Sequence, residues 1–148
     1  MPSPTLARNK EHVRTLYEEC INRGRLELLN ELVSSDYVGV NGERGPEGFR
    51  QTVAGLRSGF PDIQFTLEDL IAEGDRVAVR WRWTGTHQGA FRGLAPSHKR
   101  VTNTAIAIYQ FQADHIVRAW LEADRLGVLQ QVGGTPSDLV PAAPPAKR

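Results

Sequence analysis

Hydrophobic residues recur along the first part of the chain at the three- and four-residue spacings of amphipathic helices. The spacing predicts one helix that ends at Gly24, a second over residues 25–33, and a third that starts near Pro46 and stops at Gly59 and Pro61. The apolar positions of the first helix are Leu6, Val13, Leu16, Tyr17, Cys20 and Ile21. Three helices are therefore expected at the start of the domain.

From Asp62 onward the hydrophobic period changes to two, which is typical of half-buried strands. Extended segments are expected over residues 62–72, 76–87, 100–111 and 116–124, and a brief one over residues 34–40. Val77, Val79, Trp81 and Trp83 share one face of the second long strand. Helices followed by a meander of strands predict an α+β fold, with three N-terminal helices packed on a strongly curved antiparallel sheet that encloses a pocket.

The last strand runs directly into a helical segment, "IVRAWLEADRLGVLQQVG". Alternation places Trp120, Glu122 and Asp124 on one face of this strand, and we expect Trp83, Trp120 and Asp124 to surround one internal pocket. On this hypothesis the outer sheet face carries Ile106, Ile108, Leu121 and Ala123. An apolar outer face of this kind favours a homodimer.

Composition narrows the class of protein. The 148 residues fit one domain, expected over residues 1–133, and the Pro-rich residues 134–148 are expected to be a disordered tail. With 18 basic and 17 acidic residues, nothing in the net charge of +1 favours nucleic acid or an anionic membrane as a partner. A single cysteine, no apolar leader and no long apolar run favour a cytoplasmic protein.

Familiar cofactor motifs are absent from the sequence. His12, His98 and His115 are scattered without metal-ligand spacing, so no metal site is expected. The chain has no GxSxG, no phosphate-binding loop and no dinucleotide fingerprint. These absences argue against a serine hydrolase and against an enzyme that uses a nucleotide.

The stretches "EGDRVAVRW", "GTHQGAFRG" and "HIVRAWLEADRLGVLQQVG" occur in an order that resembles the SnoaL-like polyketide cyclase family, also called ester cyclases, of the NTF2-like superfamily. The resemblance covers residues 8–133 and implies a cone-shaped fold. It also implies cofactor-free closure of a ring by an intramolecular aldol reaction of an aromatic ester, with Asp124 at the position of the general acid/base. The same fold hosts several activities and also pure binding domains.

The chemistry of a carboxyl group in an apolar pocket supports this interpretation of Asp124. Burial disfavours the charged form, raises the pKa and allows the group to move protons near neutral pH. In the alternative interpretation Asp124 caps the helix that follows it. Both roles are compatible with one residue.

The remaining candidates would bind the substrate: Trp120, Trp83, Asn41, His87, Glu122 and Asn103. A loop histidine is often structural and a glutamate at a strand end is often solvated. A structural role for His87 and a solvated position for Glu122 therefore stay open as alternatives to substrate binding. Two functions stay open: a polyketide cyclase-like or ketosteroid isomerase-like enzyme acting on a small apolar carbonyl compound, and a non-catalytic binding module of the same fold. Ala107, at a position that is often polar in the family, favours the second.

Overall fold

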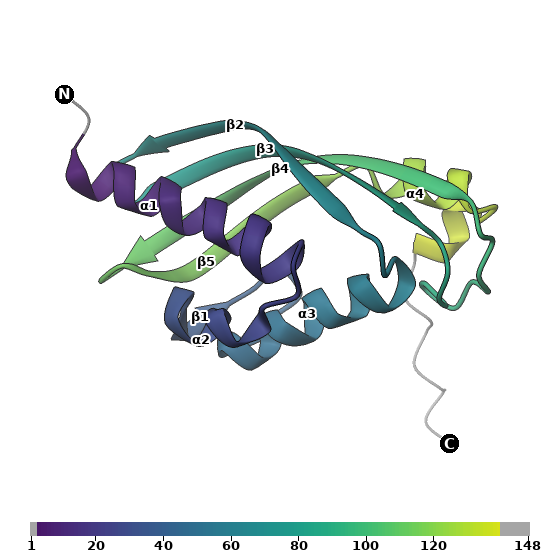
Figure 1. Cartoon of the computed structure of the whole chain (residues 1–148), viewed down its shortest axis with the longest axis horizontal. Helices are drawn as coiled ribbons and strands as arrows, with labels where there is room; N and C mark the ends of the chain where they lie inside the picture. Colours follow the sequence, from purple (N-terminus) through teal and green to yellow (C-terminus); the bar gives the residue numbers. More distant parts are fainter. Residues whose placement is uncertain (1–2, 140–148) are drawn as a thin grey trace, which may run out of the picture.

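The computed structural model describes residues 3–139 and shows an α+β fold, as the sequence predicts (Figure 1). The helices are α1 (Pro4–Thr15), α2 (Leu29–Leu32), α3 (Gly45–Gly59) and α4 (Arg125–Gln131), with a π-helical turn over Leu16–Ile21 and 3-10 turns over Leu26–Leu28 and Pro136–Leu139. The strands are β1 (Val33–Val38), β2 (Gln64–Glu73), β3 (Arg76–Thr86), β4 (Arg100–Gln112) and β5 (His115–Ala123). Part of the predicted tail, residues 140–148, lies outside the described residues.

The strands form one curved sheet in the order β1-β5-β4-β3-β2. The four long strands pair antiparallel as predicted, but β1 pairs parallel with β5, so the sheet is mixed. A parallel pair cannot be joined by a hairpin, and the chain between β1 and β5 runs through α3 and the whole meander. The edge strand was too short for its direction to be predicted.

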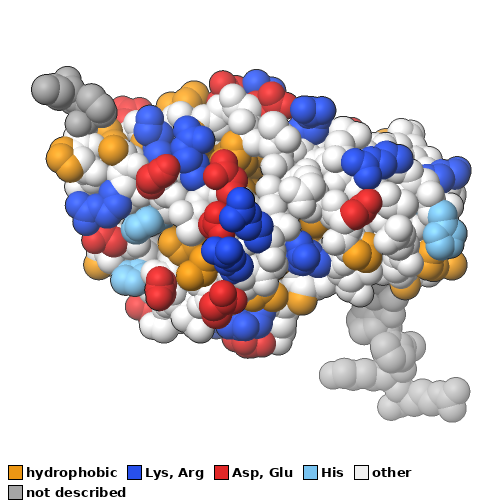
Figure 2. Space-filling model, viewed as in Figure 1, with side chains coloured by type: hydrophobic (Ala, Val, Ile, Leu, Met, Phe, Trp, Pro, Cys, Tyr) orange, Lys and Arg blue, Asp and Glu red, His pale blue; other side chains and the backbone are white. Residues whose placement is uncertain are grey.

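Figure 1 shows α1, α2 and α3 gathered under the concave side of the sheet, with α4 at one end. Ser3 caps α1 by accepting a hydrogen bond from the Thr5 N–H, and Pro4 occupies the first turn, where its missing N–H costs nothing. The predicted second helix is only a 3-10 turn followed by the four-residue α2. Figure 2 shows acidic and basic side chains intermixed on the viewed face, consistent with the small net charge.

Register fixes which side chains face the helices. Trp81 and Trp83 on β3 are buried as predicted, opposite Ala105 and Asn103 of β4. Directly paired residues point to the same face of a sheet.

The same rule corrects the prediction for β5. Trp120 pairs with Ile108 and Glu122 with Ile106, so these four residues share the outer face. Leu121 pairs with Ala107, and Ala119 and Ala123 alternate onto this inner face. The predicted faces of β5 were therefore inverted, because the bulk of Trp120 was taken as a sign of the cavity side, whereas the inner positions hold the smaller apolar residues Ala119, Leu121 and Ala123.

Candidate functional site

A cavity of about 580 Å³ lies between the inner face of the sheet and the helices. Aromatic side chains from α3, β2 and β3 form much of its wall: Phe49, Phe65, Trp81 and Trp83. Ala107, Ala119 and Ala123 occupy inner positions on β4 and β5, where larger side chains would fill the space. The cavity therefore exists because these inner positions hold small side chains beside large aromatic ones. Its aromatic walls suit a flat apolar ligand.

Two tyrosines form the buried polar centre of this cavity. The hydroxyl oxygens of Tyr17 and Tyr109 are 2.6 Å apart and share a hydrogen bond, and we call these two residues the phenol pair. Burial raises the pKa of both phenols above the ordinary value, so both stay protonated at neutral pH. Tyr37 also lines the cavity, and burial, followed by the nearby Tyr109 and Glu43, raises its pKa as well.

Sequence reasoning missed the phenol pair because Tyr17 lies on an apolar helix stripe and Tyr109 on a buried strand face. Tyr17 was counted among the apolar positions of the first helix and Tyr109 was not singled out, and both are buried. The signal that was available is that a buried tyrosine hydroxyl needs a partner.

Asn103, a predicted substrate-binding residue, lines the cavity beside Trp83. Its side chain is 9% exposed, and its Oδ1 has no hydrogen-bond partner within residues 3–139. The buried Nε1 of Trp81 is likewise unpartnered in the described part of the chain. Buried polar atoms are usually satisfied, so these two groups mark polar positions in an otherwise apolar wall.

Exposed residues at the cavity lining define its mouth. They include Asn41 of the loop between β1 and α3, Gln51 and Thr52 of α3, Arg92 and Arg125. Glu43 of the same loop is the one carboxylate among the described lining residues, and its Oε2 accepts a hydrogen bond from the Asn41 N–H at 2.9 Å. Asn41, a predicted substrate-binding residue, therefore lies at the rim of the cavity. Glu43 was not identified from the sequence.

Asp124 does not line the cavity, contrary to expectation. It is exposed at the end of β5, and its Oδ1 accepts a hydrogen bond from the Gly127 N–H at 2.9 Å, which caps α4. Its chain neighbours Ala123 and Arg125 do line the cavity. The capping alternative is therefore what the geometry shows, and a catalytic role of Asp124 stays a prediction.

His87 is fully buried but lies outside the cavity lining. Its Nδ1 accepts a hydrogen bond from the Ser97 N–H at 3.1 Å, and its ring centroid lies 5.5 Å from that of Phe60. The histidine thus connects the loop after β3 to the core. Its position fits the structural role that was the alternative to substrate binding.

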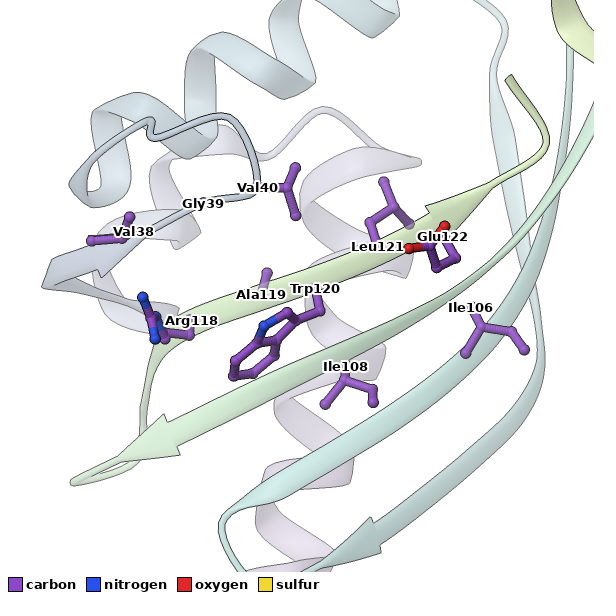
Figure 3. Close-up of a pocket in the computed structure, with 10 residues that line it drawn as sticks. All are labelled: Val38, Gly39, Val40, Ile106, Ile108, Arg118, Ala119, Trp120, Leu121 and Glu122. Atoms are coloured by element: carbon purple, nitrogen blue, oxygen red, sulfur yellow. The ribbon is translucent and has the colours of Figure 1, made fainter. Parts of the chain in front are cut away.

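Trp120 and Glu122 line a groove of about 500 Å³ on the outer side of β5, shown in Figure 3. Trp120 is also among the residues that line the inner cavity, whereas Glu122 is not. The groove also includes Ile106, Ile108 and Arg118, and residues 38–40 form its other side. The guanidinium carbons of Arg76 and Arg118 lie 4.9 and 5.9 Å from the centroid of the Trp120 ring. Trp120 is 39% exposed, because its ring packs on the outer face of the sheet and remains partly in contact with solvent.

Among residues 3–139 no group of three or more potential ligands could hold a metal ion. No helix in this part of the chain is long and apolar enough to cross a membrane.

Comparisons with known proteins agree with the fold. A model of the SnoaL-like polyketide cyclases matches residues 11–132. One similar structure is a protein from Jannaschia sp. CCS1 that is named as a SnoaL-like polyketide cyclase. It is 25% identical over 92% of this chain and 99% of its own, with a TM-score of 0.85. IdmH from Streptomyces antibioticus, named as a polyketide cyclase, is 28% identical over 84% and 98%, with a TM-score of 0.72.

A third similar structure carries a different activity in its name. AclR from Streptomyces galilaeus, named as a hydroxylase, is 28% identical over 88% of both chains, with a TM-score of 0.78. No curated protein sequence matches the chain. Similarity of fold therefore does not select one reaction.

Proposed function

The chain belongs to the SnoaL-like polyketide cyclase family, and we propose that it is a cofactor-free enzyme that closes a ring in a small, largely apolar carbonyl compound by an aldol-type reaction. One observation supports this best: the phenol pair lies in an aromatic-walled cavity of about 580 Å³. An apolar pocket with a few converging polar groups is the usual form of a small-molecule site.

An intramolecular aldol addition makes two demands on the protein. A base removes a proton from the carbon beside one carbonyl, the resulting enolate carbon attacks a second carbonyl carbon, and the new alkoxide takes up a proton. One carbon–carbon bond forms, and no atom is gained or lost overall. The protein must therefore move a proton and stabilise negative charge on oxygen.

The phenol pair can meet the second demand. One hydroxyl proton lies between the two oxygens, 2.6 Å apart, which leaves the other hydroxyl free to donate to a ligand oxygen. Because burial raises the pKa of both phenols, the donor remains neutral and protonated at neutral pH. A fixed donor that is itself buried, as both tyrosines are, stabilises an oxyanion more than water does.

A carboxylate near the mouth would move the proton. Asp124 is the candidate implied by the family resemblance, and Glu43 is the candidate that lines the cavity. The capping bond from Gly127 to Oδ1 does not use the second oxygen of Asp124.

Deuterium exchange of the methyl protons of acetylnaphthalene, followed by NMR, tests the first step without a known substrate. We expect Tyr17→Phe or Tyr109→Phe to lower the exchange rate by about 10²-fold, as for loss of one oxyanion donor. Loss of the base, by Asp124→Asn or Glu43→Gln, should lower it by about 10²–10⁴-fold. Gln130→Glu, at an exposed position outside the cavity lining, serves as a control for folding and added charge. Exchange that none of the four variants slows would contradict the proposal.

A non-catalytic binding module is the second candidate, favoured by the helix-capping position of Asp124. Under that function acetylnaphthalene would bind with no exchange above the buffer rate. An isomerase of the ketosteroid type would also exchange the protons, but it would shift the double bond of an unconjugated enone, which absorbance follows.

We also propose a homodimer built on the outer sheet face, where Ile106 is 52% and Trp120 39% exposed. Arg118, Trp120 and Glu122 follow one another along this face of β5 (Figure 3). If two copies pack face to face with β5 antiparallel, Arg118 meets Glu122 of the second copy, whereas a parallel arrangement opposes like charges.

Light scattering at tens of micromolar should therefore give the mass of two chains. We expect Arg118→Glu or Glu122→Arg alone to weaken the dimer, and the two changes together to restore it. A wild-type monomer at that concentration would rule the dimer out, and an unrestored double variant would rule out this arrangement.

A further inference from the structure

Two arginines at the cavity mouth have no assigned role. Arg92 and Arg125 are both exposed and both line the cavity. Neither forms an ion pair with a carboxylate of residues 3–139. We infer that they bind a carboxylate on the ligand, so that the ligand is a free aromatic acid whose apolar body enters the cavity while its charge stays at the mouth. The inference rests on the proposed ligand site and not on the proposed reaction.

Arg92 occupies a backbone position that disfavours its residue type. Residues 91–94 form a tight turn in which the Phe91 and Leu94 backbones exchange hydrogen bonds of 3.0 and 2.8 Å. Both central residues have positive φ, 50° at Arg92 and 77° at Gly93. Asparagine or aspartate is the preferred partner of glycine in such turns, and an arginine there is strained. Strain of this kind concentrates at functional positions, where another requirement outweighs it.

The side chain of Phe91 fixes this turn against the core. Its ring centroid lies 5.1 Å from that of Phe60, and it lines the cavity beside Arg92. The turn therefore holds Arg92 next to the aromatic wall of the cavity.

Arg125 is also locally unfavourable, since it is the first residue of α4. The N-terminal end of a helix carries partial positive charge, where a basic side chain is disfavoured, and the first turn of α4 contains no acidic residue. Two carboxylates are candidates to pair with it: its chain neighbour Asp124, which accepts from the Gly127 N–H, and Glu43, which lines the same cavity and accepts from the Asn41 N–H. Each thus has a backbone partner, and neither pairs with an arginine.

The chemistry of the two groups indicates the ligand class. A guanidinium matches a carboxylate with two parallel hydrogen bonds, and such charge-assisted bonds are stronger than neutral ones. A neutral ester at the same place would lose the charge interaction while keeping the aromatic contacts. The cavity should therefore prefer an acid over its own methyl ester.

Calorimetry with naphthoic acid and methyl naphthoate tests this preference at pH 7. We expect the acid to bind about tenfold more tightly than the ester, and added salt to reduce the difference. Arg92→Asn or Arg125→Gln should lower affinity for the acid about tenfold and leave affinity for the ester unchanged. Lys99→Gln removes an equal charge outside the cavity lining and should change neither.

Stability separates this role from a structural one. Because asparagine suits positive φ, Arg92→Asn should unfold at the same or a higher temperature. Equal affinities for acid and ester in the wild type, or an equal loss for both in the variants, would overturn the inference. Tyr17→Phe tests the proposed reaction separately, since it should slow proton exchange without changing the preference for the acid.

Discussion

Both faces of the sheet carry a tryptophan, but the one on the inner face is buried and the one on the outer face is partly exposed. On the inner face Trp83 is buried, with its ring centroid 4.8 Å from that of Phe60. On the outer face Trp120 is 39% exposed and lies beneath two arginines. Residue type alone does not distinguish them. Strand register decides which tryptophan is core and which is surface.

Charged residues differ between the faces in the same way. The outer face of β3 carries Arg80 and Arg82, paired with Asp69 at 2.7 Å and Glu68 at 3.2 Å on β2. These pairs are about half exposed, and exposed pairs contribute about 0–1 kcal/mol each. The inner face instead buries neutral polar groups, Tyr17, Tyr109 and Asn103. The polar groups on the inner side are therefore neutral and shielded from water, whereas those on the outer face are charged and in contact with it.

The strongest test of this comparison is a matched pair of tryptophan substitutions. Trp83→Ala should lower the free energy of unfolding by about 3–5 kcal/mol, because it leaves a cavity among aromatic rings. Trp120→Ala should cost less than about 1 kcal/mol in dilute monomer, because the ring is already partly in water. Urea titration followed by circular dichroism measures both. Equal losses would mean that the faces are not distinguished as described.

Alkaline pH should weaken the inner face selectively. The phenol pair and Tyr37 have raised pKa values in the fold, so their contribution to stability is complete below the unfolded-state pKa near 10 and declines as pH rises above it. Each phenol should reduce the free energy of unfolding by about 1.4 kcal/mol per pH unit in that range. Urea titrations between pH 8 and about pH 11 measure the slope, and Tyr17→Phe should reduce it. A slope equal to that of the variant would contradict the burial of Tyr17.

The smallest expected effect is at Asp124, directly after the end of β5. Asp124→Ala should cost about 1 kcal/mol through loss of the cap on α4, whereas Asp124→Asn should cost almost nothing. Thermal unfolding of both variants measures the cap independently of any activity. An equal loss in both would mean that the charge of Asp124, rather than its capping bond, stabilises the protein.

Much of the fold followed from periodicity alone. The change of period near Asp62, the buried face of β3 and the four antiparallel strands are all as predicted. Long segments with one apolar face allow a single burial pattern, and family resemblance gave the same fold. The direction of β1 could not be predicted, because six residues with little alternation do not define a register.

The candidate site was predicted less well than the fold. Trp83 and Asn103 lie in the cavity and Asn41 at its rim. Trp120 is also among the lining residues, although its pairing with Ile108 places it on the outer face of the sheet, and Glu122 lies outside the cavity. The β5 pattern was misinterpreted because its largest apolar residue, Trp120, lies on the face that also carries Arg118 and Glu122, whereas the other face is apolar throughout. Glu43 and the phenol pair required three-dimensional contacts between residues far apart in the chain, which no local spacing encodes.

The parallel contact between β1 and β5 has a consequence for the order of folding. Strands β2 and β3, and likewise β4 and β5, are joined by two-residue turns and can form as hairpins, with the loop of residues 87–99 between them, whereas Val33 must meet Ile116 across most of the chain. Distant contacts carry a greater loop-closure entropy and tend to form late. We therefore expect β1, and with it α3 and the cavity wall, to dock last and open first, which native-state hydrogen exchange would show as weaker protection of β1 than of β3. A ligand in the cavity would then act on kinetics as well as on equilibrium, by holding closed the step that the chain completes last.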